Sequence, residues 1–116
     1  MVKAFLFHNP RCSKSRQALT LLQEQKENFE IFLYLNEEID KNFLKEVLSK
    51  LAIEPRELLR TGEEIYKENN LGNLNISSDE IIDLMIKFPK LIERPIFVKG
   101  TKAIIGRPPE NVLTII

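Results

Sequence analysis

The apolar residues of this chain recur in two patterns, and their order along the sequence predicts an α/β fold. Val2 to Phe7 and Phe29 to Leu35 are short apolar and aromatic runs, which favour buried strands. Between them, apolar residues at helical spacing predict a helix from Ser13 or Ser15, either of which is a suitable N-cap, to Gln25. A strand, a helix and a strand with short connections predict a βαβ unit with parallel strands.

A helical insertion is predicted at about 40–90. Three helices are expected there, each opened by a capping or helix-starting residue: Asp40, Pro55 and Ser77. The second helix is expected to stop at Gly62 and the third at Pro89.

The C-terminal part of the chain predicts a hairpin and a last helix. Ile96 to Val98 and Ala103 to Ile105 are short strands joined by a connection of hairpin length. Pro109 opens the helix, and its inner side is predicted to carry Val112, Leu113 and Ile116. The order βαβ, helical insertion, ββα is that of a thioredoxin-like fold. We therefore expect one domain over residues 1–116, with a mixed four-stranded sheet flanked by helices.

Charge and composition exclude several classes of protein. Seventeen Lys and Arg residues balance seventeen Asp and Glu residues, so there is no net field to attract nucleic acid or an anionic membrane. The apolar run Ala4 to Phe7 is too short for a signal-peptide core or a membrane span. We expect a cytoplasmic monomer that binds neither nucleic acid nor membrane. The single cysteine, Cys12, cannot form an internal disulfide or a cysteine-rich zinc site, so no metal is expected.

Cys12 lies between the predicted first strand and first helix. The first N–H groups of a helix lack intrahelical partners and the helix dipole is positive there, so this position favours a thiolate and an incoming anion. Residues 8–16, HNPRCSKSR, contain no large apolar side chain, so we expect Cys12 to be accessible and reactive. The alternative is an inert, buried cysteine, the commoner fate of a lone cysteine in a cytosolic protein.

The single histidine, His8, precedes Cys12 by four residues and leaves two roles open. A polar residue at a strand end is often a turn former. If the loop folds back, His8 would instead take the thiol proton or stabilise the thiolate. The spacing alone does not decide between these roles.

Three arginines lie at boundaries of predicted elements. Arg94 in ERPIFV and Arg107 in IGRPPE stand beside prolines, and Arg60 ends the short central helix. Singly, a surface arginine is most often a solvated charge. However, Pro95 lies where a thioredoxin-like fold keeps its cis-proline, which faces the cysteine loop. The five fixed donors of a guanidinium match a tetrahedral oxyanion, so these arginines are candidate oxyanion ligands.

These residues together resemble a known family, the glutathione- and glutaredoxin-coupled arsenate reductases, which are ArsC-like proteins of thioredoxin-like fold. The resemblance runs from the first strand to the last helix and is carried by His8-Asn9-Pro10, Cys12, Ser15-Arg16, Arg60, Glu93-Arg94-Pro95 and Gly106-Arg107-Pro108. It implies that the nucleophile is Cys12. It implies that arsenate, or a similar oxyanion, is bound by Arg60, Arg94 and Arg107. It also implies that the thiolate is held with help from His8 and Ser15.

The implied cycle needs no bound cofactor. Cys12 attacks arsenate and displaces water or hydroxide, glutathione attacks the adduct as a co-substrate, and glutaredoxin removes the glutathione so that arsenite leaves. A lone cysteine agrees with this cycle, because further reducing equivalents must come from outside thiols.

Two alternatives remain open. One is a glutathione-dependent thiol reductase of another substrate, which would use the same Cys12. The other is a regulator of the same superfamily that binds RNA polymerase and senses oxidants through a C-x-x-C pair. Ser15 stands at the position of the second cysteine of that pair, so a disulfide switch within the chain is impossible.

Overall fold

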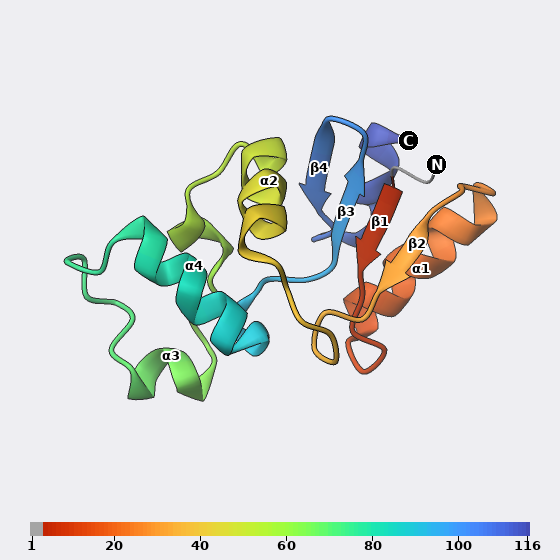
Figure 1. Cartoon of the computed structure of the whole chain (residues 1–116). Coiled ribbons are helices and arrows are strands. Elements are labelled where there is room, and N and C mark those ends of the chain that lie inside the picture. The colour runs from red at the N-terminus through yellow and green to blue at the C-terminus, as the bar shows by residue number, and fades with distance from the viewer. Residues whose placement is uncertain (1–3) are drawn as a thin grey trace. The chain divides into compact units, whose positions relative to one another are not determined.

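The computed structural model describes residues 4–116, which form two compact units (Figure 1). The sheet unit combines the described residues up to Glu37 with Arg94–Ile116, and the helical unit comprises Glu38–Glu93. The sheet unit is therefore built from both ends of the chain. The expectation of one domain with a helical insertion stays a prediction.

The sheet unit contains a four-stranded mixed sheet with the strand order β2-β1-β3-β4 among the described residues. Strand β1 (Ala4–Phe7) pairs in parallel with β2 (Glu30–Phe32) and antiparallel with β3 (Ile96–Lys99), which pairs antiparallel with β4 (Lys102–Ile105). This topology confirms the predicted thioredoxin-like fold class.

Helix α1 (Ser13–Glu24) and the 3₁₀ helix η3 (Pro109–Ile115) pack on each other and on the sheet. Their shared core consists of small and large apolar side chains from both helices and the two central strands: Ala4, Leu6, Ala18, Leu22, Phe97 and Val112. Alternate residues of β1 and the i, i+4 face of α1 thus meet in one apolar layer, as the two periodicities require. This layer holds the start of α1 beside the carboxyl end of β1.

Strand β2 is shorter than predicted. The apolar run Phe29 to Leu35 is strand only over Glu30–Phe32, because the chain turns where the N–H of Asn36 donates to the carbonyl of Leu33 at 2.9 Å. Tyr34 in that turn is nonetheless fully buried, and its ring lies 5.9 Å from the ring of Phe7 between centroids. The prediction of a buried strand is therefore wrong for most of this run: Tyr34 is buried outside the strand, whereas Ile31 and Leu35 are exposed. Val2, at the predicted start of β1, lies outside the described residues.

The C-terminal hairpin has a tighter turn than predicted. Strands β3 and β4 leave Gly100 and Thr101 between them, and Gly100 has φ +61°, which glycine adopts without a side-chain clash. The prediction that Ile116 faces inward is wrong, since its side chain is 46% exposed. The last helix is a 3₁₀ helix that ends at Ile115, so the 3.6-residue spacing used for the prediction does not apply.

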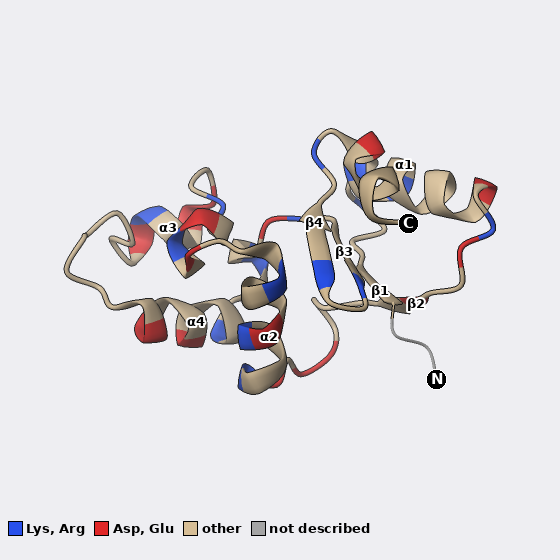
Figure 2. Cartoon of the chain, turned by 90° about the horizontal axis from the view of Figure 1, so that it is seen from above, with Lys and Arg blue, Asp and Glu red and all other residues tan. Residues whose placement is uncertain are grey.

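The helical unit confirms the predicted helix starts at Asp40, Pro55 and Ser77. Helix α2 (Lys41–Leu51) is capped by Asp40, whose carboxylate accepts the N–H of Phe43 at 3.0 Å. Helix α4 (Ser78–Lys87) begins with a capping box between Ser77 and Glu80. Figure 2 shows charges of both signs on these helices, and Lys41 of α2 pairs with Asp79 and Asp83 of α4 at 3.1 and 2.9 Å.

Three shorter helices complete the helical unit: η1 (Pro55–Leu58), α3 (Glu64–Glu68) and η2 (Pro89–Leu91). The prediction that Gly62 stops the second helix is wrong. Helix η1 ends earlier because Leu59 is extended and forms a β-bridge with Ile92. Helix α3 was not predicted, since it buries none of its residues and so has no apolar pattern.

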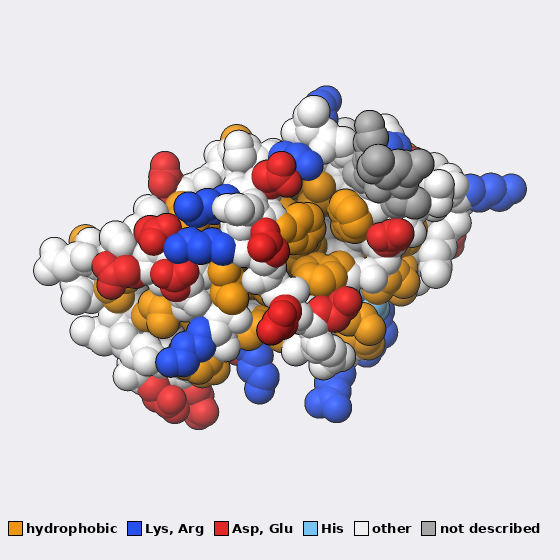
Figure 3. Space-filling view, viewed as in Figure 1, with side chains coloured by type: hydrophobic (Ala, Val, Ile, Leu, Met, Phe, Trp, Pro, Cys, Tyr) orange, Lys and Arg blue, Asp and Glu red, His pale blue; other side chains and the backbone are white. Residues whose placement is uncertain are grey.

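Some large hydrophobic side chains of the described residues remain at the surface, as Figure 3 shows for one face. The most exposed are Ile31, Leu35, Leu74 and Ile116. Within residues 4–116, no helix has the length and apolar character needed to cross a membrane.

Candidate active site

Cys12 occupies the N-cap of helix α1. Its backbone is extended, with φ −93° and ψ 122°, and its carbonyl accepts the N–H of Arg16 at 3.0 Å. The prediction of Ser13 or Ser15 as N-cap is therefore wrong, since both lie within the first turn of α1. The N-cap is the position toward which the unpaired amides of a helix point, so the sulfur is placed in their field.

The sulfur of Cys12 is less accessible than the sequence predicts. Cys12 is only 8% exposed, although its loop is polar. Burial raises the pKa of the Cys12 thiol, but the N–H groups of Ser15 and Lys14 and the guanidinium of Arg94 act in the opposite direction. The net result is a pKa below the ordinary value for cysteine. A thiolate is thus favoured in a nearly enclosed site, where charge-assisted hydrogen bonds are strong.

Two arginines from the far end of the chain converge on this sulfur. Nη2 of Arg107 donates to Sγ of Cys12 at 3.6 Å, and Nε of Arg107 donates to the carbonyl of Arg94 at 2.7 Å. Both arginines precede cis-prolines, Pro95 and Pro108. The segments before β3 and after β4 therefore present two guanidinium groups to one thiolate.

Gly106 permits the close approach of these two segments, a feature that sequence reasoning missed. Its N–H donates to the carbonyl of Pro95 at 2.8 Å. A Cβ atom on Gly106 would lie 2.8 Å from Cγ of Pro95 and 3.0 Å from Cγ1 of Val112, closer than side chains pack. The glycine before Arg107 in IGRPPE was the available signal, because glycine is common where backbones approach closely.

His8 and Ser15 form a buried polar pair behind the cysteine loop. They are 5% and 0% exposed, and Nδ1 of His8 lies 2.7 Å from Oγ of Ser15. The same Oγ accepts the N–H of Asn9 at 3.0 Å. Ser15 therefore ties the start of the loop to the first turn of α1.

The protonation of His8 bears on the two roles that the sequence left open. Burial, and then the positive charge of Arg16, lower the pKa of His8 below its ordinary value of 6.5. A neutral imidazole bonded to Ser15 is therefore favoured at neutral pH. This arrangement supports a structural role in the loop more than an imidazolium that stabilises the thiolate.

Arg60 belongs to the helical unit and has acidic partners there. Its guanidinium pairs with Glu93 at 3.4 Å and with Glu63 at 4.0 Å, and its backbone N–H donates to the carbonyl of Leu91 at 2.8 Å. It follows the β-bridge at Leu59 instead of ending a helix, as the sequence had predicted. A shared oxyanion site for Arg60 and Cys12 stays a prediction.

The fold and the site define a thioredoxin-like protein with a single activated thiol beside arginine donors, a setting suited to nucleophilic chemistry on anions. Residues 7–115 match the ArsC family, and the chain belongs to that family. It is 47% identical over 112 residues to the protein YfgD of Escherichia coli strain K12, covering 96% of this chain and 94% of that protein. It is 43% identical to the arsenate reductase of Haemophilus influenzae, covering 99% and 100%. Among solved structures, the arsenate reductase from Vibrio cholerae superposes with a TM-score of 0.94 at 43% identity, covering 97% of each chain.

Proposed function

We propose that the chain is an arsenate reductase in which the Cys12 thiolate attacks arsenate. The observation that carries the proposal is the contact of Arg107 with Cys12, 3.6 Å between Nη2 and Sγ, at a thiol whose pKa is lowered. The similarity of nearly the whole chain to the arsenate reductase of Haemophilus influenzae supports arsenate as the oxyanion.

The first step forms a sulfur–arsenic bond and releases water or hydroxide from arsenate. Arg94 and Arg107 bind the oxygens of the anion and offset the charge that they gather in the transition state. The N–H groups of Lys14 and Ser15, which favour the thiolate, are also donors to an oxyanion at the helix start. Arg60 joins them as a third ligand once it exchanges a carboxylate for the oxyanion.

The two electrons that reduce arsenate to arsenite come from two thiols, which end as a disulfide. The chain has one cysteine, so at least one thiol is external. We propose glutathione as that thiol and glutaredoxin as the protein that removes it from the enzyme. Reduced glutathione is the thiol of the cytoplasm, which we propose as the compartment.

In this proposal, His8 and Ser15 act on the thiolate indirectly, by fixing the backbone of the cysteine loop. By joining Asn9 and His8 to the helix start, Ser15 keeps its own N–H aimed at the sulfur. Neither residue has to exchange a proton with the substrate.

The decisive experiment measures arsenite formed from arsenate by the purified chain, with glutathione alone, with glutaredoxin alone and with both. We expect turnover only with both thiol donors and none in Cys12→Ser. Arsenite production that persists in Cys12→Ser, or its absence from the wild-type protein with both donors, would reject the function. Turnover with glutathione alone would keep the reductase and remove glutaredoxin.

A further inference from the structure

Arg107 is an exposed residue, yet its guanidinium has a defined place beside the nucleophile. Its Nη2 donates to Sγ of Cys12 at 3.6 Å and its Nε donates to the carbonyl of Arg94 at 2.7 Å. A long arginine side chain at the surface has many accessible rotamers, and restricting it to one of them costs conformational entropy. The contact with the sulfur therefore persists only if the backbone that carries Arg107 is itself held in place.

The side chain of Asn111 holds that backbone. Asn111 is half-buried in the first turn of η3, and its Nδ2 donates to the carbonyl of Arg107 at 3.1 Å. The same nitrogen lies 3.5 Å from the carbonyl of Ile105, the last residue of β4. Both partners are carbonyl oxygens, which only accept, so the nitrogen of the amide must be the atom that faces them. One side chain thus links η3 to the end of β4 and to the residue that reaches the sulfur.

Residues 106–108, which connect β4 to η3, need such bonds because they belong to neither element. The N–H of Gly106 donates to the carbonyl of Pro95 at 2.8 Å, and the N–H of Asn111 donates to the carbonyl of Pro108 at 3.0 Å. The side-chain bond from Asn111 to Arg107 lies between these two in the sequence. The connection is therefore fixed by individual hydrogen bonds instead of a regular ladder, so the loss of one of them affects its conformation directly.

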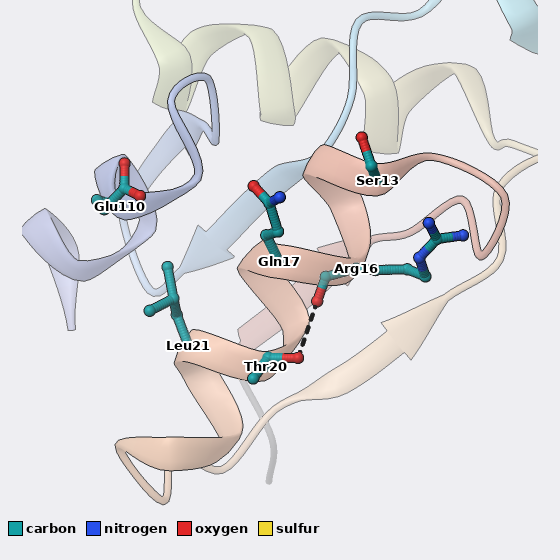
Figure 4. Close-up of a pocket in the computed structure, with 6 residues that line it drawn as sticks. All are labelled: Ser13, Arg16, Gln17, Thr20, Leu21 and Glu110. Atoms are coloured by element: carbon teal, nitrogen blue, oxygen red, sulfur yellow. Dashed lines mark hydrogen bonds between the residues drawn. The ribbon is translucent and has the colours of Figure 1, made fainter.

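Other side chains of η3 have different surroundings. Glu110 lines an open groove along α1 (Figure 4), and Cys12 is not among the described residues that line it. The hydroxyl of Thr114 donates to the carbonyl of Asn111 at 2.7 Å, which is a bond within η3. Asn111 thus supplies the side-chain link between η3 and the segment of Arg107.

We propose that Asn111 is a positioning residue, which fixes the carbonyl of Arg107 and thereby keeps the guanidinium at the Cys12 sulfur, where it also meets an incoming oxyanion. Asn111 acts through Arg107. The part of this inference that concerns the oxyanion rests on the proposed function, whereas the part that concerns the sulfur does not.

The first test measures the thiol pKa from the pH dependence of the alkylation rate of Cys12, without arsenate. We expect Asn111→Ala to raise this pKa, because the guanidinium that favours the ionised sulfur is less often in place. We expect a smaller rise in Asn111→Ser, since a serine hydroxyl can donate to the carbonyl four residues earlier. An unchanged thiol pKa in Asn111→Ala would overturn the proposal.

The matched control is Thr114→Ala, which removes a hydrogen bond within η3 and leaves the bond from Asn111 to Arg107 intact. We expect this variant to keep the thiol pKa of the wild type. An equal rise of the pKa in Thr114→Ala and Asn111→Ala would reduce the effect to a loosening of η3 and refute the positioning role.

A double-mutant cycle tests whether Asn111 acts through Arg107. In the Arg107→Ala background, we expect Asn111→Ala to cause no further rise of the thiol pKa, because the guanidinium that it positions is gone. Its effect on the urea midpoint should remain, since the carbonyl of residue 107 is still present. A further rise of the pKa as large as in the wild-type background would show that Asn111 acts on the sulfur independently and would reject the proposal.

Arsenate binding is measured separately, as protection of Cys12 from alkylation. We expect half-protection of Asn111→Ala to need about two- to tenfold more arsenate, because the loss of one hydrogen bond lowers the population of the binding-competent arrangement. A raised thiol pKa in Asn111→Ala, with no protection of the wild type by arsenate, would reject arsenate and retain the positioning role. Equal protection of the wild type and Asn111→Ala, with an unchanged pKa, would retain the proposed function and reject Asn111.

Discussion

Arg107 and Arg60 place the same side chain in two different environments. Arg107, in the sheet unit, donates to the carbonyl of Arg94 and to the sulfur of Cys12. Arg60, in the helical unit, is paired with the carboxylates of Glu63 and Glu93. The first guanidinium therefore acts on the nucleophile before any substrate arrives, whereas the second is balanced by acidic side chains of its own unit.

This difference separates two contributions that an arginine can make to an oxyanion enzyme. A guanidinium in contact with a thiolate favours the ionised sulfur and is also available as a donor to an incoming anion. One that is paired with carboxylates must exchange a partner for the anion, so its effect is confined to the bound state. The thiol pKa and the oxyanion affinity are therefore expected to respond differently to substitution in the two units.

The largest effect is expected from Arg94→Ala. Because Arg94 lowers the pKa of Cys12 by a hydrogen bond and by its charge, its loss raises that pKa. We also expect weaker arsenate binding by about 1.5 to 3 kcal/mol, the range for a hydrogen bond to a charged group. The pH dependence of the alkylation rate measures the first effect, and competition by arsenate measures the second.

The matched control is Arg60→Ala, which we expect to weaken arsenate binding without changing the thiol pKa. An equal rise of the thiol pKa in Arg94→Ala and Arg60→Ala would contradict the distinction between arginines of the sheet unit and of the helical unit. Wild-type affinity in Arg94→Ala would remove Arg94 from the site.

The next largest effect is expected from Ser15→Ala, because Ser15 holds the loop that carries the nucleophile. It leaves the N–H of Asn9 and the ring of His8 without their buried partner, which is expected to lower the free energy of unfolding by about 1 to 3 kcal/mol. Ser13→Ala is the control, since Ser13 is exposed on the same helical turn. Urea denaturation of both variants measures the difference, and similar midpoints would contradict a special role for Ser15.

Gly106→Ala tests whether the close packing around Gly106 stabilises the segment that carries Arg107. The added Cβ meets Pro95 and Val112, and we expect a loss of stability of about 1 to 2 kcal/mol, the lower part of the range for overpacking, because a small shift can relieve the contact. Gly62→Ala, two residues after Arg60, is the counterpart in the other unit, where nothing lies within 4 Å of the new atom. Thermal unfolding that is lowered equally in both variants would exclude this packing argument.

The smallest effect is expected in the dependence of stability on pH. The pKa of Cys12 is lower in the folded chain than in the unfolded one, so the ionised sulfur stabilises the fold at pH values above the unfolded pKa. That contribution is lost as the pH falls through the folded pKa. The difference in unfolding free energy between the wild type and Cys12→Ser should therefore grow as the pH rises toward about 8.5. A flat difference over that interval would contradict the lowered pKa.

Local patterns predicted much of the fold. Asp40 and Ser77 cap their helices as expected, because capping depends on a side chain and an N–H three residues away. Periodicity failed where tertiary packing decided the backbone. Tyr34 is buried in a turn, and Leu59 leaves its helix to bridge Ile92. In both cases a burial signal was correct and the type of element was not.

The candidate site was predictable in part. The position of Cys12 at a helix start follows from the residues around it, and Arg94 and Arg107 were selected by the prolines beside them. The low exposure of Cys12 was not predictable, because the groups near its sulfur include Arg94 and Arg107, which are distant in the chain. The close approach of Gly106 to Pro95 was missed for the same reason, since the two residues lie on different segments.

The amino-acid sequence alone determined the order of the four strands and of the helices α1, α2 and α4, and the place of the cysteine at the start of α1. Those features depend on hydrogen bonds and apolar spacing within a few residues of each other. Only the tertiary structure decided that Arg107 reaches the sulfur of Cys12, 95 residues earlier. That contact requires the pairing of β1 with β3 and the approach of Gly106 to Pro95, neither of which a local pattern encodes.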